Sequence, residues 1–163
     1  MAHPATTANP ITTVLEPEQQ RVAGEVLCAT VVDLIDLSLI GKQAHWNVIG
    51  PRFRTLHLAL DELVDTARDF TDSAAERATA IGVSPDGRAR TVAGNSSGDT
   101  FPPGWQQDGD VVAAVVATLG AVVRRLRERI GESEKADPVT QDLLIAVAAR
   151  LEQLHWMWQA QAA

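Results

Sequence analysis

The chain has 163 residues, enough for one domain with a sizeable core, and its 45% of hydrophobic residues is ordinary for a globular protein. Its formal net charge of −7 argues against a general nucleic-acid binder and suits a protein that attracts cations. With no apolar run of about 18 residues, no signal-peptide pattern and one cysteine, Cys28, in an apolar helical context, the sequence predicts a cytoplasmic protein that has no membrane span or disulfide and whose thiol is buried and inert.

The first fifteen residues carry no Asp, Glu, Lys or Arg, and their two prolines and four threonines disfavour a regular helix. We therefore predict a flexible N-terminal tail over residues 1–15, in which His3 is solvated, and one domain over residues 16–163.

Apolar residues then recur at steps of three and four, and this pattern predicts a helix over about 16–50 in which Pro17 occupies the first turn. Gly50 ends that helix, and Pro51 opens a second one, expected over about 52–81. Because the connection is so short, the two helices are expected to be antiparallel neighbours.

Gly82 is expected to cap the second helix, and residues 83–109 interrupt the pattern with turn-forming and small polar residues. A connection of this length can cross the full height of a bundle, and we expect a short helix midway. Asp108 or Asp110 is expected to cap a third helix. Near the end of that helix lie four arginines, interpreted as a solvated helix end or, alternatively, as a basic patch for nucleic acid: Arg124, Arg125, Arg127 and Arg129.

Asp137 followed by Pro138 predicts the start of a fourth helix, which runs to about Gln159. His155 within it is interpreted as a structural or surface histidine. Four long helices, two short links and one long crossover predict an all-α protein with the ferritin-like form of a four-helix bundle.

Potential metal ligands are phased along the second helix. His57 and Asp61 are four residues apart, and so are Asp72 and Glu76, so each pair faces one way. Between Asp61 and Asp72 the helix advances by roughly 20° around its axis, so the two pairs share a face. Along the axis, however, His57 and Glu76 are about 28 Å apart. One ion therefore cannot be bound by both pairs of one straight helix.

Three interpretations are open. The acidic residues of this helix can form a solvated stripe, or the pairs can be two separate half-sites, each poor in ligands. Alternatively, the helix pairs with its copy in a second chain, antiparallel across a two-fold axis near residues 66 and 67. The His57 pair of each chain would then face the Glu76 pair of the other, and the contact would occur twice.

In that arrangement His45, twelve residues before His57, can fold back across the Gly50–Pro51 reversal toward the same place. Two imidazoles and up to three carboxylates suit Fe(II), which accepts nitrogen and oxygen ligands in an open geometry. Zinc is an alternative, although the lack of cysteine disfavours a structural zinc site.

The same residues carry a resemblance to a known family. The segment 42–47 reads KQAHWN, and it is followed by Phe53, Leu56–His57, Asp61–Glu62 and Asp72–x–x–x–Glu76. This pattern is similar, without gaps, to the signature of the Dps family, the mini-ferritins of bacterial nucleoids and starved cells. The resemblance extends over the chain from about residue 20, and it implies a spherical dodecamer that encloses a small iron store.

The resemblance also implies a ferroxidase site between subunits, where Fe(II) is bound and oxidised, preferentially by hydrogen peroxide, with oxygen as the other oxidant. Its ligands would be His45, His57 and Asp61 of one chain with Asp72 and Glu76 of the two-fold mate.

Three further roles are implied beside the ligands. Trp46 is a candidate redox neighbour or a packing residue, and Lys42 is a charge partner for a site carboxylate. An acidic pore is expected at the start of the last helix, from Asp137 and Asp142, with Glu134; Asp142 is the better candidate, because Asp137 can instead serve only as the N-cap.

The sequence departs from the family members that bind DNA through basic tails, because residues 1–20 and the segment after Arg150 contain no Lys or Arg. Acidic chains without such tails should be repelled by DNA phosphates, which leaves the arginines of 124–129, with Arg88 and Arg90, as the candidates for DNA contact. We expect iron oxidation and storage that protects against oxidative damage. The alternatives are a nucleoid protein that binds and protects DNA, with iron oxidation secondary, and a helical scaffold without a metal role.

Overall fold

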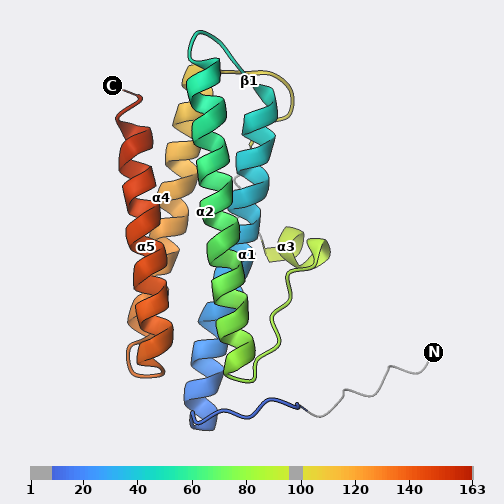
Figure 1. The fold of residues 1–163 in the computed structure, drawn as a ribbon, viewed down its shortest axis with the longest axis vertical. Coiled ribbons are helices and arrows are strands. Elements are labelled where there is room, and N and C mark those ends of the chain that lie inside the picture. Colours follow the sequence, from blue (N-terminus) through green and yellow to red (C-terminus); the bar gives the residue numbers. More distant parts are fainter. Residues whose placement is uncertain (1–8, 96–100, 163) are drawn as a thin grey trace, which may run out of the picture.

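The computed structural model describes residues 9–95 and 101–162. Within them, four long helices lie side by side as a bundle: α1 (Pro17–Asn47), α2 (Phe53–Ala80), α4 (Asp108–Ser133) and α5 (Pro138–Gln159) (Figure 1). The short α3 (Ala89–Asn95) lies in the crossover and contacts α1. The all-α, ferritin-like bundle with a long crossover and a short helix in it is confirmed.

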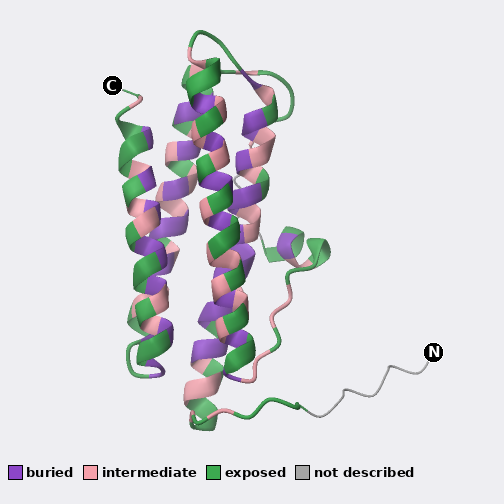
Figure 2. Ribbon diagram, viewed as in Figure 1, coloured by how far each residue is buried: buried purple, intermediate pink, exposed green. Residues whose placement is uncertain are grey.

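Buried residues recur along all four long helices of the bundle (Figure 2). Leu34, Leu60, Leu119 and Leu151, one from each long helix, are fully buried in a single cluster. Burial of each such side chain contributes about 1.5–3 kcal/mol relative to exposure. A smaller cluster around Leu27 joins α1 to the C-terminal half of α2. Among the described helices, none is long and apolar enough to cross a membrane.

The helix ends follow local capping chemistry. α1 starts at Pro17 behind a capping box, in which the Glu16 backbone N–H donates to the Gln19 side chain at 3.0 Å. α5 starts as predicted at an Asp137 cap, whose carboxylate accepts from the backbone N–H groups of Val139 and Thr140.

The N-terminal segment lies partly outside the described residues, since positions 1–8, with His3, belong to that part. Residues 9–15 form neither helix nor strand, and the Asn9 amide donates to the Gly82 carbonyl at 2.6 Å. Gly82 has φ +78°, as expected for the residue that closes α2, and an added Cβ would come within 3.0 Å of the Ile11 carbonyl oxygen.

The reversal between α1 and α2 is tied to the far end of the crossover. Residues 48–49 leave the helix as β1 (Val48–Ile49) and pair in parallel with β2 (Gln106–Gln107). α1 therefore ends at Asn47 and not near Gly50 as predicted, because β1 bonds to a remote segment.

The predicted cap of α4 is wrong. Its N-cap is Gln107, and Asp108 lies in the first turn with its carboxylate bound to Arg52 at the start of α2. The side chain has a partner on another helix, so it does not cap its own.

Candidate metal centre

Two histidines meet where α1 ends and α2 begins. His45 Nδ1 lies 3.0 Å from the His57 carbonyl oxygen, and His57 Nδ1 lies 3.0 Å from the His45 carbonyl oxygen. Since a carbonyl oxygen only accepts, these bonds require a proton on each Nδ1 and leave each Nε2 with the free lone pair. The two rings stack with centroids 3.6 Å apart. Both imidazoles are thus oriented by the backbone, in the way that metal-binding histidines are oriented by the partner of their second nitrogen.

Asp61 completes a three-residue group with the histidines. Its Oδ1 lies 3.2 Å from His45 Nδ1 and 2.5 Å from Lys42 Nζ, so Lys42 is the predicted partner of a site carboxylate. One ligand atom from each of His45, His57 and Asp61 lies within 4.8 Å of the others, a spacing that can hold a metal ion. The hydrogen bond from Lys42 lowers the pKa of Asp61, against the effect of burial, and the nearby His45 adds to the lowering. The carboxylate is therefore ionised and ready to bind a cation.

Two aromatic residues, one in contact with His57 and one next to His45 in sequence, are open to solvent. Phe53 packs its ring 5.1 Å from that of His57, and it is 45% exposed. Trp46, next to His45 in sequence, is 65% exposed, so it does not pack into the core of its own chain. An uncovered apolar rim beside a polar site is a feature of surfaces that meet a partner.

Asp72 and Glu76 lie on the C-terminal half of α2, away from the histidines. Both are exposed, and among the described residues neither has a hydrogen-bond or ion-pair partner. α2 is continuous from Phe53 to Ala80, so the rise of a helix separates Asp61 from Glu76 by about 22 Å. One chain therefore brings together three of the five predicted ligands and holds the other two apart.

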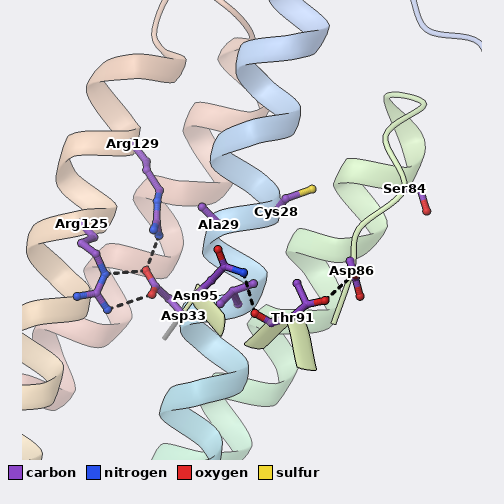
Figure 3. A pocket seen from close by; sticks show the side chains of 10 residues that line it. Cys28, Ala29, Asp33, Ser84, Asp86, Thr91, Asn95, Arg125 and Arg129 are labelled. Carbon is purple, nitrogen blue, oxygen red and sulfur yellow. Dashed lines mark hydrogen bonds and ion pairs between the residues drawn. The ribbon is translucent and has the colours of Figure 1, made fainter. Parts of the chain in front are cut away.

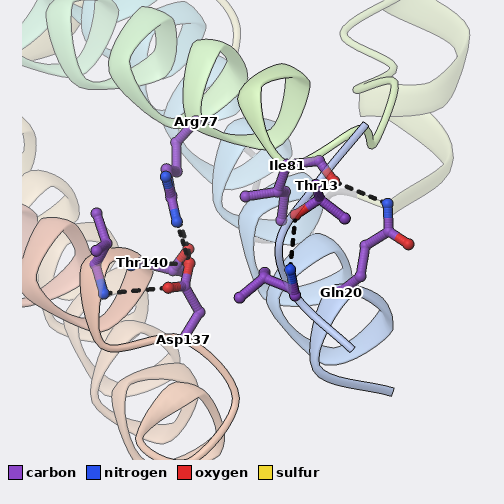
Figure 4. A network of polar contacts seen from close by, with 8 residues as sticks. Thr13, Gln20, Arg77, Ile81, Asp137 and Thr140 are labelled. Atoms are coloured by element: carbon purple, nitrogen blue, oxygen red, sulfur yellow. Dashed lines mark hydrogen bonds and ion pairs between the residues drawn. The ribbon is translucent and has the colours of Figure 1, made fainter. Parts of the chain in front are cut away.

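The pore candidates differ in exposure. Asp137 is buried, where its carboxylate accepts from Arg77 of α2 and from the Thr140 hydroxyl, the latter at 2.6 Å (Figure 4). Burial raises the pKa of this carboxyl, but the bonds from Thr140 and Arg77 outweigh it and the pKa is lowered. Asp142 and Glu134 are exposed.

The arginines near the end of α4 are not all solvated, which corrects the interpretation made from the sequence. Arg125 and Arg129 turn inward to Asp33 of α1, which is buried, with Nε–Oδ2 and Nη1–Oδ2 distances of 2.9 and 2.7 Å (Figure 3). These three residues line a cavity of about 410 Å³ beside α3, together with Cys28. The cysteine is only half-buried, and burial raises the pKa of its thiol, as expected for an unreactive one. The charge run in α4 did not reveal the inward turn, because its partner lies on another helix.

Comparison with known proteins agrees with the fold. A family model described as "Ferritin-like domain" matches residues 25–163. The chain is 35% identical over 143 residues to "DNA protection during starvation protein 2" of Deinococcus radiodurans, which covers 88% of this chain but 59% of that protein's own length. It is 36% identical over 129 residues to the "DNA protection during starvation protein" of Mycolicibacterium smegmatis, covering 77% of this chain and 68% of the relative.

A solved structure has the same fold. "Structure of Dps from Microbacterium arborescens in the high iron form" superposes with a TM-score of 0.87 at 33% sequence identity, over 92% of this chain and 97% of the other.

Proposed function

The chain belongs to the Dps family of ferritin-like proteins, a family of iron storage and DNA protection, and on that premise we propose that it is a ferroxidase. It binds Fe(II) at a site shared by two subunits and oxidises it, with hydrogen peroxide as the preferred oxidant and oxygen as the alternative. The ferric product is stored inside a cytoplasmic cage of twelve chains, which keeps Fe(II) and peroxide from damaging the cell.

One observation carries the proposal: two imidazoles and one carboxylate, from His45, His57 and Asp61, lie close enough to hold one ion, with His57 and Asp61 partly exposed and the exposed Phe53 beside His57. This mixture of nitrogen and oxygen ligands with positions left open suits Fe(II). In the reaction, two Fe(II) ions each give up one electron, and the two electrons with two protons reduce one hydrogen peroxide to two waters. The protein supplies the ligands, and the iron is the substrate.

The remaining ligands come from a second copy. Residues 57 and 76, and equally residues 61 and 72, are centred on one point between positions 66 and 67 of α2, so a two-fold axis there brings each histidine pair opposite an acidic pair. Asp72 and Glu76, exposed and without partners among the described residues, are available for this role. The same contact covers Trp46 and Phe53, which removes apolar surface from water. Trp46 would then lie beside the iron, as a redox neighbour or a packing residue.

Charge guides iron to the interior. Twelve chains of −7 each carry roughly −80 formal units, a field that attracts Fe(II) and concentrates it at acidic openings. Asp142 and Glu134, which are exposed, are the proposed lining of such a pore, with Asp137 behind them as the cap of α5.

DNA binding is a second candidate, which the names of the relatives favour. The arginines of α4 give it little support, because Arg125 and Arg129 are engaged by Asp33 and Arg127 is paired with Glu152. Binding to DNA would have to overcome the net negative charge, so retardation of plasmid DNA is expected to be weak and to vanish as salt rises toward physiological concentration. Retardation that persists at that salt would favour the DNA-protecting function.

Mixing two inactive variants tests the shared site. His45→Ala/His57→Ala removes one half of the site, and Asp72→Ala/Glu76→Ala removes the other, so each pure variant should oxidise Fe(II) with peroxide more than about a hundredfold more slowly than wild type. A dimer of one variant with the other has one site with both halves intact and one with neither. After co-assembly from equal amounts, random pairing should restore roughly a quarter of the wild-type rate.

These measurements distinguish a shared site from a site within one chain and from a site built of other residues. Unchanged oxidation in the histidine variant would exclude the proposed ligands altogether. A site within one chain could contain only His45, His57 and Asp61, so Asp72→Ala/Glu76→Ala alone would then keep the wild-type rate. Gel filtration and circular dichroism of each pure variant control for assembly and folding.

A further inference from the structure

The separation of the two histidines depends on the reversal between α1 and α2. His45 and His57 bond reciprocally to each other's carbonyl oxygens, and this is possible only when the last turn of α1 and the first turns of α2 keep one spacing. The reversal itself, residues 48–52, contains two residues of strand and a short turn. Whatever fixes the reversal therefore fixes the two imidazoles.

Asp108, in the first turn of α4, fixes it from outside. Its Oδ2 accepts from the Arg52 backbone N–H at 3.0 Å and from Arg52 Nε at 3.3 Å. Arg52 is the N-cap of α2 but makes no side-chain cap bond, and the first turn of α2 has no acidic residue. Asp108 supplies the negative charge that a helix N-terminus favours and that α2 does not supply itself. Arg52 Nη1 also donates to the Gln161 carbonyl at 2.6 Å, which joins the segment after α5 to the same point.

The backbone of the reversal is built to accept this carboxylate. Gly50 has φ +122°, a conformation that side chains disfavour, and a Cβ added there would lie 2.9 Å from Asp108 Cγ. The β1–β2 pair brings Gln107, the residue before Asp108, alongside Ile49. The Asp108 side chain is 15% exposed, and the Arg52 backbone N–H and guanidinium lower its pKa against the effect of burial, so it stays charged. Gly50, the β1–β2 pair and Asp108 thus together hold the reversal in one conformation, and we call this group the brace.

We propose that Asp108, acting through Arg52, is a positioning residue for the metal centre. It touches no metal ligand, but by fixing the reversal it holds the two imidazoles in the stacked arrangement that binds the metal. This role rests on the proposed function, since the bound metal is what the positioned imidazoles serve. A residue that only stabilised the fold would change unfolding without changing metal affinity, and that difference separates the two roles.

Replacement of Asp108 in the full chain tests the brace, with Co(II) as a probe that binds like Fe(II) but needs no oxidant. Co(II) affinity, measured by visible absorption and calorimetry, should fall about ten- to a hundredfold in Asp108→Ala. It should fall less in Asp108→Asn, whose amide oxygen can still accept from the Arg52 N–H. The KM for Fe(II) should rise by a similar factor, while kcat at saturating iron changes less. Glu152→Gln, which breaks the Arg127 ion pair between α4 and α5 away from the reversal, is the matched control and should keep wild-type affinity.

Each outcome either supports or overturns the positioning role of Asp108. Wild-type Co(II) affinity in folded Asp108→Ala, or an equal loss in Glu152→Gln, overturns the positioning role but leaves the metal centre intact. If Asp108→Ala does not fold, Asp108→Asn is decisive in the same way, since unchanged affinity and KM there also overturn it. If wild-type protein neither binds Co(II) nor oxidises Fe(II), the proposed function itself fails, and this inference fails with it.

Discussion

Both ends of α2 carry candidate metal ligands, but those at one end are held by hydrogen bonds and those at the other end are exposed to solvent. At the N-terminal end, His57 and Asp61 are held by hydrogen bonds and an ion pair from the end of α1, so their geometry is set before any metal arrives. At the C-terminal end, Asp72 and Glu76 project into solvent, and their helix is anchored one residue further on by Arg77. The side chains at the N-terminal end are therefore oriented by contacts within the chain, whereas those at the C-terminal end are positioned only by the helix that carries them.

In the proposed shared site, this difference would divide the work between the two ends of one chain. Imidazoles need a defined tautomer and ring orientation, which a neighbouring backbone supplies. Carboxylates are acceptors whose two oxygens can adapt to a metal, so position on a rigid helix is enough for them. The proposed assembly joins the organised end of one copy to the adaptable end of the other.

The largest expected effect comes from releasing the anchor of the C-terminal end. Asp137→Ala removes the buried partner of Arg77 and the cap of α5 together, so the free energy of unfolding should fall by about 3–5 kcal/mol. Asp142→Ala, exposed on the same helix, should change it by less than about 0.5 kcal/mol. Chemical denaturation measures both. A loss below about 1 kcal/mol in Asp137→Ala would show that Arg77 finds another partner and that this end needs no anchor.

A second test compares the free energy of unfolding after removal of one proposed ligand from each half of the site. His45→Ala loses the bond to the His57 carbonyl and the ring stack, which should destabilise the fold by about 1–3 kcal/mol. Glu76→Ala loses no hydrogen bond or ion pair to the described part of its own chain and should lie within about 0.5 kcal/mol of wild type under conditions that keep the protein monomeric. Equal losses in the two variants would contradict the contrast between the ends.

The smallest expected effect is on thermal stability at acidic pH, when Lys42 is replaced. Because Lys42 lowers the folded-state pKa of Asp61, the stability that this pair contributes is fully present above the unfolded pKa of about 3.9 and is lost as pH falls through the lower, folded value. Lys42→Met removes the largest cause of the lowered pKa of Asp61, so its Tm should be slightly lower than wild type at pH 7 and should fall less steeply below pH about 4. Thermal unfolding from neutral pH into this acid range measures it, and parallel curves for the two proteins would deny the ion pair any role.

Much of this arrangement could be predicted from local patterns. The four-residue spacing of His57 and Asp61, together with the Gly50–Pro51 reversal, brings His45 back toward them, and the structure places the three side chains together. A periodic pattern reports which face a residue occupies and where a helix starts or stops, and these facts are enough to place that group. They also fix the phase of Asp72 relative to Asp61.

The parts that could not be predicted all depend on the path of the crossover. Asp108 reads as a helix cap by its position, yet it bonds to Arg52 because the crossover returns it to the reversal. Arg125 and Arg129 read as surface charges, yet they converge on Asp33 of a helix that is remote in sequence. In each case the partner is set by packing between distant segments, which no local spacing encodes.

The unbroken length of α2 has a consequence for how this chain can vary. Because the helix is continuous from Phe53 to Ala80, it acts as a ruler between the two pairs of ligands. A substitution on it changes one side chain, but a single inserted or deleted residue between positions 61 and 72 would swing everything beyond it by about 100° and slide it by about 1.5 Å. In the proposed dimer, the acidic pair would then face away from the histidines of the second copy, although every proposed ligand would still be present. Relatives that keep the shared site should therefore tolerate many replacements in this segment and no change in its length.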